Sequence, residues 1–171
     1  VDVARLKLMK ANHQSQQYRL EDNLLRYFPE QIEQNKKFIE GFNADMKTLA
    51  EHPHPVDGFA GMTVRGDVLT DKENAGAALV DAFKDVKGLD PVQIGTYRGF
   101  TMSLTLEDFG RDYVLTLKGQ MTHRVTLGKD PRGNLTRIDN TLNGMAERLT
   151  TVQGKLDSLY AQMETAKQEL G

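Results

Sequence analysis

The stretch IDNTLNGMAERLTTVQGKLDSLYAQMETAKQEL, residues 138–170, decides the fold. Its apolar residues alternate steps of four and three: Ile138, Leu142, Met145, Leu149, Val152, Leu156, Leu159, Met163, Ala166 and Leu170. This heptad spacing keeps one apolar stripe of a helix facing a partner helix. As one helix the stretch would extend about 50 Å. A helix of this length cannot bury its stripe alone, so it requires a partner.

The N-terminal third of the chain offers that partner. A second heptad series contains Ile32, Ile39, Phe42, Met46 and Leu49. Pro29 precedes it and favours a kink, because proline cannot donate a helical hydrogen bond. The two helical regions flank the middle of the chain, so they must run antiparallel if they pair. The sequence therefore predicts an antiparallel helical hairpin, a coiled-coil stalk, formed by residues 1–51 and 133–171.

The middle segment, residues 56–130, has the pattern of a small α/β head. Residues 62–68, 100–106 and 113–127 alternate apolar and polar side chains, as half-buried strands do. The last of these is too long for one strand, so we expect a hairpin loop at Lys118-Gly119-Gln120 with Leu117 facing Met121. A capping box at Thr70–Glu73 begins one amphipathic helix. The expected fold is α+β: a helical hairpin with an inserted head of three to four antiparallel strands and one helix.

A second capping box places the start of the C-terminal helix. Thr136 is followed three residues later by Asp139, directly after the turn formed by residues 130–133. We therefore expect Asp139 to lie in the first turn of that helix.

Composition restricts the class of protein. No apolar run approaches the length that crosses a bilayer, and the N-terminus does not resemble a signal peptide. The chain has no cysteine, which excludes disulfides and thiolate metal sites and suits the cytoplasm. Its start without Met suggests a piece of a longer protein. The 22 basic and 24 acidic residues give a net charge of −2, without the excess of a typical duplex-binding domain.

Motifs for chemistry are absent from the sequence. It contains no phosphate-binding loop, dinucleotide fingerprint or nucleophile elbow. His52 and His54 either bind a metal or belong to a solvated linker, and no third ligand is evident. His123 lies on the apolar side of its strand, where a backbone-bonded core histidine is the expected role. We predict no catalytic residue, no metal and no cofactor.

Two features could contact nucleic acid. In Gly95-Thr-Tyr-Arg-Gly-Phe100, the glycines could expose Tyr97 and Arg98 for stacking on bases, or the stretch could be a bulged edge strand whose Tyr97 packs inward. Between residues 118 and 137 the only acidic residue is Asp130, whereas five residues are basic: Lys118, Arg124, Lys129, Arg132 and Arg137. This excess is either a phosphate-contacting surface or a solvated basic rim.

Several short stretches together resemble one family. They are Leu8-Met-Lys-Ala-Asn-His13, Tyr27-Phe-Pro-Glu-Gln31, Gly61-Met-Thr63, Gly95-Thr-Tyr-Arg-Gly-Phe100, Leu115-Thr-Leu-Lys-Gly119, Val125-Thr-Leu-Gly128 and Gly133-Asn-Leu-Thr-Arg-Ile138. In this order they resemble the C-terminal region of large bacterial proteins of conjugative elements and phages. Those proteins combine a Swi/Snf-type helicase with an adenine-specific DNA methyltransferase. The resemblance implies a parent that works on DNA with ATP. It carries over no catalytic residue, because the motifs of both activities are missing from this chain.

Two functions fit these observations. The first is a non-catalytic accessory module of a mobile-element helicase–methyltransferase, which spaces or couples neighbouring domains and contacts DNA weakly. The alternative is a protein–protein assembly module that forms a homodimer and does not contact nucleic acid. An independent enzyme is the least supported class, and no membrane partner is expected.

Overall fold

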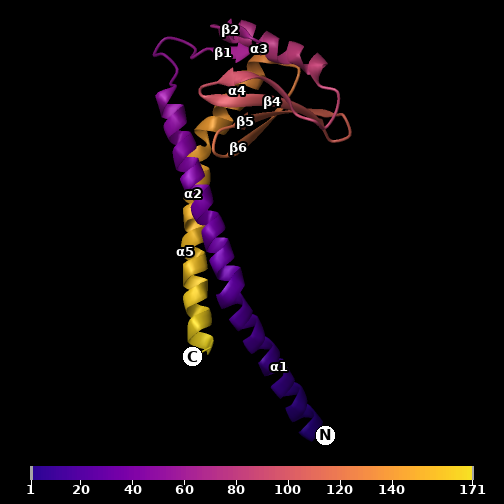
Figure 1. Ribbon diagram of the computed structural model, residues 1–171, viewed down its shortest axis with the longest axis vertical. Coiled ribbons are helices and arrows are strands. Elements are labelled where there is room, and N and C mark those ends of the chain that lie inside the picture. Colours follow the sequence, from indigo (N-terminus) through magenta and orange to yellow (C-terminus); the bar gives the residue numbers. More distant parts are fainter. Residues whose placement is uncertain (1, 171) are drawn as a thin grey trace. The chain divides into compact units, whose positions relative to one another are not determined.

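The chain forms two compact units, shown in the computed structural model of Figure 1. The structure describes residues 2–170, apart from the side chains of residues 2, 4–6 and 8–11. The helical unit comprises residues 1–40 and 149–171, and the head unit comprises residues 41–148. Val1 and Gly171, the outer ends of the two predicted stalk segments, lie outside the described residues.

The helical unit is built from both ends of the chain. In chain order its elements are α1 (Asp2–Asp22), the π-helical turn η1 (Asn23–Tyr27), the first part of α2 (Phe28–Glu51) and most of α5 (Met145–Leu170). Its buried cluster consists of Phe28, Ile32, Leu159 and Ala166, with Leu20, Leu24, Leu156 and Met163 packed against it. Four apolar side chains of residues 20–32 thus pack against those of α5: Leu20, Leu24, Phe28 and Ile32.

The π-helical turn lies directly before Pro29. The backbone N–H of Phe28 donates to the carbonyl of Asn23, five residues earlier, rather than to the carbonyl four residues earlier. Pro29 has no N–H to donate, and in a regular helix its ring would press on the carbonyl of Leu25. The wider turn gives the ring room without ending the helix.

The head unit contains a six-stranded antiparallel sheet with the order β2-β1-β3-β4-β5-β6. Its strands are β1 (Met62–Val64), β2 (Asp67–Leu69), β3 (Val92–Tyr97), β4 (Phe100–Glu107), β5 (Asp112–Lys118) and β6 (Thr122–Leu127). Strand β6 forms one edge of the sheet and the short strand β2 forms the other.

Helices cover one face of this sheet. They are α3 (Lys72–Asp81), followed by the 3-10 turn η2 (Ala82–Asp85), and α4 (Pro131–Asn143). Helix α3 packs on α4 and β1, and α4 packs on β6. The fully buried core of the head includes Val64, Leu79, Tyr97, Phe100, Met102, Leu104, Leu115, Leu117, Ile138, Leu142 and Met145.

The other face of the sheet is open and rich in hydroxyl groups. Along β6, exposed and buried residues alternate strictly, so that Thr122, Arg124 and Thr126 face away from the core. The cross-strand pairing adds Thr101, Ser103, Thr116 and Lys118 to the same face. We call this surface the open sheet face.

The predicted head of three to four strands and one helix is wrong. Residues 62–69 form two strands joined at Arg65-Gly66, where both residues have positive φ, rather than one strand. Strand β3, with a bulge between Gln93 and Gly95, agrees with the alternative of a bulged strand around Tyr97, but it lies between β1 and β4 rather than at an edge of the sheet. Helix α4, expected as the start of the stalk, is a second helix of the head.

The predicted continuous coiled-coil hairpin is also wrong. The C-terminal stretch is divided at Gly144 into α4 and α5. The first seam residues, Ile138, Leu142 and Met145, are buried in the head unit. Of the remaining seam residues only Leu159 and Ala166 are fully buried. The heptad spacing arose because two amphipathic helices with different partners follow each other in phase.

Two predicted helix starts are shifted. Helix α4 begins at Pro131, so Asp139 lies in its interior rather than in its first turn. Helix α3 is capped by Asp71, whose Oδ1 accepts from the N–H of Asn74 at 2.8 Å, and not by Thr70.

The β5–β6 hairpin exists, but its register differs from the expected one. Leu117 pairs with His123 and Lys118 with Thr122, so the loop is Gly119–Met121. A shift by two residues keeps the same side chains on the apolar face.

Candidate functional site

A buried carboxylate joins the end of α2 to the β5–β6 loop. Asp45 Oδ1 accepts from the N–H of Gln120 at 2.7 Å, and Oδ2 accepts from the N–H of Met121 at 2.9 Å. Asp45 Oδ2 also lies 2.8 Å from Nε2 of His123. Both side chains are 1% exposed. Asp45 therefore uses three hydrogen bonds to fix this loop against the helix, and we call this group the Asp45 clamp.

The clamp explains the register of the hairpin. A Cβ atom at Gly119 would lie 2.3 Å from Asp45 Oδ1 and 2.8 Å from a ring carbon of Phe100. Only glycine lets the loop approach the carboxylate this closely. The helix thus selects a loop that the strand pattern alone did not predict.

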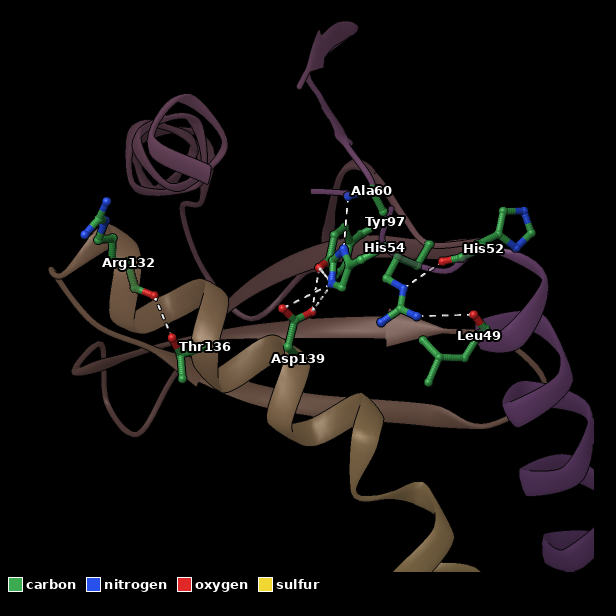
Figure 2. A network of polar contacts seen from close by, with 9 residues as sticks. Leu49, His52, His54, Ala60, Tyr97, Arg132, Thr136 and Asp139 are labelled. Atoms are coloured by element: carbon green, nitrogen blue, oxygen red, sulfur yellow. Dashed lines mark hydrogen bonds and ion pairs between the residues drawn. The ribbon is translucent and has the colours of Figure 1, made fainter. Parts of the chain in front are cut away.

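A second group of contacts, which we call the Arg98 joint, connects the β3–β4 turn to the C-terminus of α2. Arg98 and Gly99 form the two-residue turn, with φ of 47° and 85°, as a type I′ hairpin requires. Arg98 Nε donates to the carbonyl of His52 at 2.7 Å, and its terminal Nη2 donates to the carbonyl of Leu49 at 3.3 Å (Figure 2). The guanidinium thereby donates to two carbonyls at the end of the helix, of which that of Leu49 also accepts from the N–H of His52, and it places a positive charge at the negative helix end.

A third group connects α4, β3 and the loop after α2. Tyr97 OH donates to Asp139 Oδ1 at 2.5 Å, and His54 Nε2 lies 3.2 Å from the same hydroxyl (Figure 2). The N–H of Ala60 donates to His54 Nδ1 at 3.0 Å. Phe59 stacks on both the His54 and the Tyr97 ring, with centroid distances of 5.8 Å.

The hydrogen bonds define the protonation of this group. His54 Nδ1 accepts from a backbone amide, so the neutral ring carries its proton on Nε2 and donates it toward Tyr97 and Asp139. Burial raises the pKa of Tyr97 far above its usual range, and the hydrogen bond to Asp139 and the charge of that carboxylate add to the shift. Tyr97 is thus held as a phenol that donates to a carboxylate.

One cavity of the head lies beside Arg98 and another lies beside Asp139. One, of about 410 Å³, is lined by His52, Pro53, Ala60, Gly61, Thr63, Thr96, Arg98 and Gly99. The other, of about 330 Å³, is lined by Lys72, Arg132, Leu135, Thr136 and Asp139. We refer to them as the Arg98 cavity and the Asp139 cavity.

The predicted nucleic-acid residues are divided among several places. Tyr97 is buried, with 2% of its surface exposed, and Arg98 caps α2. Lys118 and Arg124 lie on the open sheet face, where Arg124 pairs with Glu107. That ion pair and the bond from Thr105 hold the pKa of Glu107 below its usual value.

The other three basic residues follow β6. Lys129 is exposed in the connection to α4. Arg132 lies 3.7 Å from Glu73 and lines the Asp139 cavity. Arg137 donates to the backbone carbonyl of Thr126 at the sheet edge. The structure thus brings Lys118 and Arg124 together on the open sheet face, whereas Arg132 lies at the Asp139 cavity.

Sequence reasoning missed Asp45 and Asp139. Asp45 lies within the apolar heptad series, between Phe42 and Met46, and an acid in that stripe was the available signal. His123 is a core histidine, as expected, but its partner is this carboxylate rather than a backbone group. Asp139 had been assigned to a helix cap.

Among the side chains that the structure describes, no three His, Asp or Glu residues are grouped so that they could hold a metal ion. Over the same residues, every helix is too short or too polar to cross a bilayer. Comparisons with protein-family models, curated proteins and solved structures find no match to the chain.

Proposed function

We propose that the chain is a non-catalytic accessory module of a larger cytoplasmic, bacterial DNA-processing protein, of the helicase–methyltransferase kind that its sequence resembles. In this proposal the head is a rigid joint that couples neighbouring domains of the parent and makes a weak contact with DNA. The observation that carries it is the Asp45 clamp, in which one buried carboxylate accepts three hydrogen bonds and fixes the end of a long helix to the sheet.

The other polar groups of the head support the same function. Arg98 ties the β3–β4 turn to the last carbonyls of α2, and Tyr97 ties β3 to α4 through Asp139. Asp45, Arg98 and the Tyr97–Asp139 pair thus each join a helix to the sheet. Fully satisfied buried networks of this kind make a structure rigid and specific. Rigidity at the points where helices enter and leave the head is what a coupling module needs.

The basic residues support a weak DNA contact. Lys118 and Arg124 lie on the open sheet face, where hydroxyl groups surround them. Glu107 neutralises part of the charge of Arg124. A few phosphate contacts give a shallow salt dependence and a dissociation constant no better than that of non-specific binding, about 10⁻⁴–10⁻⁶ M.

The test is a titration of labelled single-stranded and double-stranded DNA at low salt. The Lys118→Glu/Arg124→Glu double variant should weaken binding at least tenfold. The matched control, Lys36→Glu/Lys37→Glu, makes the same change of net charge at exposed residues of the helical unit and should have little effect. If both variants lose the same amount of DNA affinity, or if the wild type does not bind DNA, the proposed DNA contact is wrong.

A specific observation favours the alternative, an assembly module. In the helical unit, Tyr18 and Leu25 are 71% and 78% exposed. Large apolar side chains in solvent often mark a protein contact. Sedimentation of the chain over a concentration series tests this alternative: a dimer that Leu25→Glu dissociates would favour it over the accessory module.

A further inference from the structure

The Arg98 cavity has the chemistry of an anion site. Among the described residues that line it, Arg98 and His52 can carry positive charge and none is acidic. The Asp139 cavity differs, because a carboxylate forms part of its wall and opposes the charges of Lys72 and Arg132. An anion would therefore enter the Arg98 cavity at a smaller electrostatic cost.

The guanidinium is held in place with donors to spare. Arg98 uses Nε and one N–H of Nη2 on the carbonyls of His52 and Leu49. A guanidinium has five N–H groups, so three remain for another acceptor. Because the side chain is already ordered by the helix end, binding of a ligand costs little of its conformational entropy.

His52 is oriented by the same helix end. Its Nδ1 lies 2.9 Å from the carbonyl oxygen of Thr48, which can only accept, so Nδ1 carries the proton. Nε2 is left to accept from a protonated ligand oxygen, or to donate when the ring is charged. Gly99 permits this approach, since a Cβ atom there would lie 3.0 Å from Nδ1 of His52.

Two threonine hydroxyls complete the site. Thr63 and Thr96 are directly opposite each other on β1 and β3, and both line the cavity. Within the described part of the chain, neither hydroxyl has a hydrogen-bond partner. The pairing continues across the open sheet face from Thr96 to Thr101 and then to Lys118. Lys118, the second cationic residue, therefore lies two strand spacings, about 10 Å, from Thr96.

We infer that the Arg98 cavity binds a phosphoryl group. The three remaining N–H groups of the guanidinium and the two hydroxyls supply five donors, which exceeds the four or so lone-pair sites of a carboxylate and suits the three terminal oxygens of a phosphoryl group. The phosphoryl group can belong to a free phosphate monoester or to the backbone of a nucleic acid. The row of hydroxyls that leads to Lys118 would guide a strand across the sheet in the second case. The site does not depend on the proposed accessory function, because a free monoester can bind where DNA does not.

The experiment is an amide NMR titration of the whole chain with sodium phosphate, at an ionic strength kept constant with sodium chloride. The amides of Thr63, Thr96 and Arg98 should shift and saturate. The Thr63→Val/Thr96→Val variant keeps two β-branched side chains in the strands but removes both hydroxyl donors, and it should weaken binding about tenfold. The matched control is Thr116→Val on the same face, which should leave the affinity unchanged. Thermal unfolding of each variant checks the fold, and the two single valine variants, each expected to weaken binding about threefold, replace a double variant that does not fold.

Further titrations separate the sources of the phosphoryl group. A nucleoside 5′-monophosphate and an oligothymidylate without terminal phosphates are added to the same variants. Oligothymidylate binding that the valine substitutions weaken assigns the site to a nucleic-acid backbone, and binding of the monophosphate alone assigns it to a free monoester. The inference is overturned if phosphate produces no saturable shifts at the cavity. It is equally overturned if acetate binds as tightly as phosphate, or if Thr116→Val weakens binding as much as the double variant.

Discussion

The carboxylate of Asp45 lies 2.8 Å from Nε2 of His123, and the two residues are 78 positions apart in the chain. The same carboxylate accepts from the amides of Gln120 and Met121. One helical side chain therefore holds both the turn and the first inward residue of β6.

Removing this carboxylate should destabilise the head strongly. Asp45→Ala leaves the imidazole of His123 and two loop amides without their acceptor. The loss of one partner from a buried pair typically costs about 3–5 kcal/mol. The measurement is amide hydrogen exchange at Leu115 and Leu117, in the middle of β5. Asp57→Ala removes an exposed carboxylate and should change the same opening free energy by less than about 0.5 kcal/mol. An equal, small effect of both substitutions would contradict the role given to the clamp.

Tyr97 predicts a dependence of stability on alkaline pH. Its pKa is raised in the folded chain, whereas an unfolded tyrosine has a pKa of about 10. Below that pH both states keep the phenol proton, and the free energy of unfolding does not change through this group. Above it only the unfolded state releases the proton, so this free energy should fall by up to about 1.4 kcal/mol per pH unit.

Urea unfolding of the wild type and of Tyr97→Phe between pH 9 and pH 11 measures this dependence. The substitution removes the bond to Asp139 and should cost about 1–3 kcal/mol at neutral pH. It should also make the decline above pH 10 shallower. Tyr18→Phe, at a tyrosine with 71% of its surface exposed, is the control. A decline of the same slope in Tyr97→Phe and the wild type would show that another group causes it.

The sequence predicted some strands of the head but not the contacts that Asp45, Arg98 and Asp139 make. Strands β4 and β5 were predictable because their side chains alternate over seven or eight residues. Strands β1 and β2 have three residues each, too few for a pattern, and the Arg65-Gly66 turn lacks the usual asparagine or aspartate. The heptads identified Ile138 and Leu142 as buried residues of α4, but several seam residues of α5 are only partly buried. An apolar stripe does not reveal whether its partner is a helix or a sheet. The roles of Asp45, Arg98 and Asp139 depend on contacts between distant residues, which spacing along the chain cannot show.

The purified chain should hydrolyse no ATP and transfer no methyl group to DNA. The sequence lacks both the nucleotide-binding motifs of a helicase and the catalytic tetrapeptide of an adenine methyltransferase. A phosphate-release assay with and without DNA, and a methyl-transfer assay with labelled donor, measure the two activities. The control is a mock preparation from cells with an empty vector. Turnover above that control would mean that the chain is an enzyme and would refute the accessory-module proposal.

The helical unit should depend on Leu159. This side chain is 4% exposed and belongs to the cluster formed with Phe28, Ile32 and Ala166. Leu159→Ala should cost about 2–5 kcal/mol, because the removed methyl groups leave a cavity. Leu25→Ala, at a residue with 78% of its surface exposed, should cost far less. Hydrogen exchange along α5 measures both, and protection unchanged in Leu159→Ala would contradict the packing of this unit.

Alanine substitutions at two glycines with similar positive φ distinguish the cost of backbone strain from the cost of a steric clash with α2. Gly99 and Gly66 have φ of 85° and 88°, so alanine at either position adopts the same disfavoured conformation. A Cβ atom at Gly99 would lie 2.6 Å from Thr48 Cγ2, whereas none of the other atoms lies within 4 Å of one at Gly66. Gly66→Ala should therefore cost about 1 kcal/mol through backbone strain alone. Gly99→Ala should cost more, by about 1–3 kcal/mol, because the β3–β4 turn must move away from the end of α2.

The movement of this turn separates Arg98 from the carbonyls of Leu49 and His52, so hydrogen exchange at the last turn of α2 should accelerate in Gly99→Ala and not in Gly66→Ala. Equal destabilisation by the two substitutions would mean that the turn does not press on the helix, and the Arg98 joint would lose its structural basis.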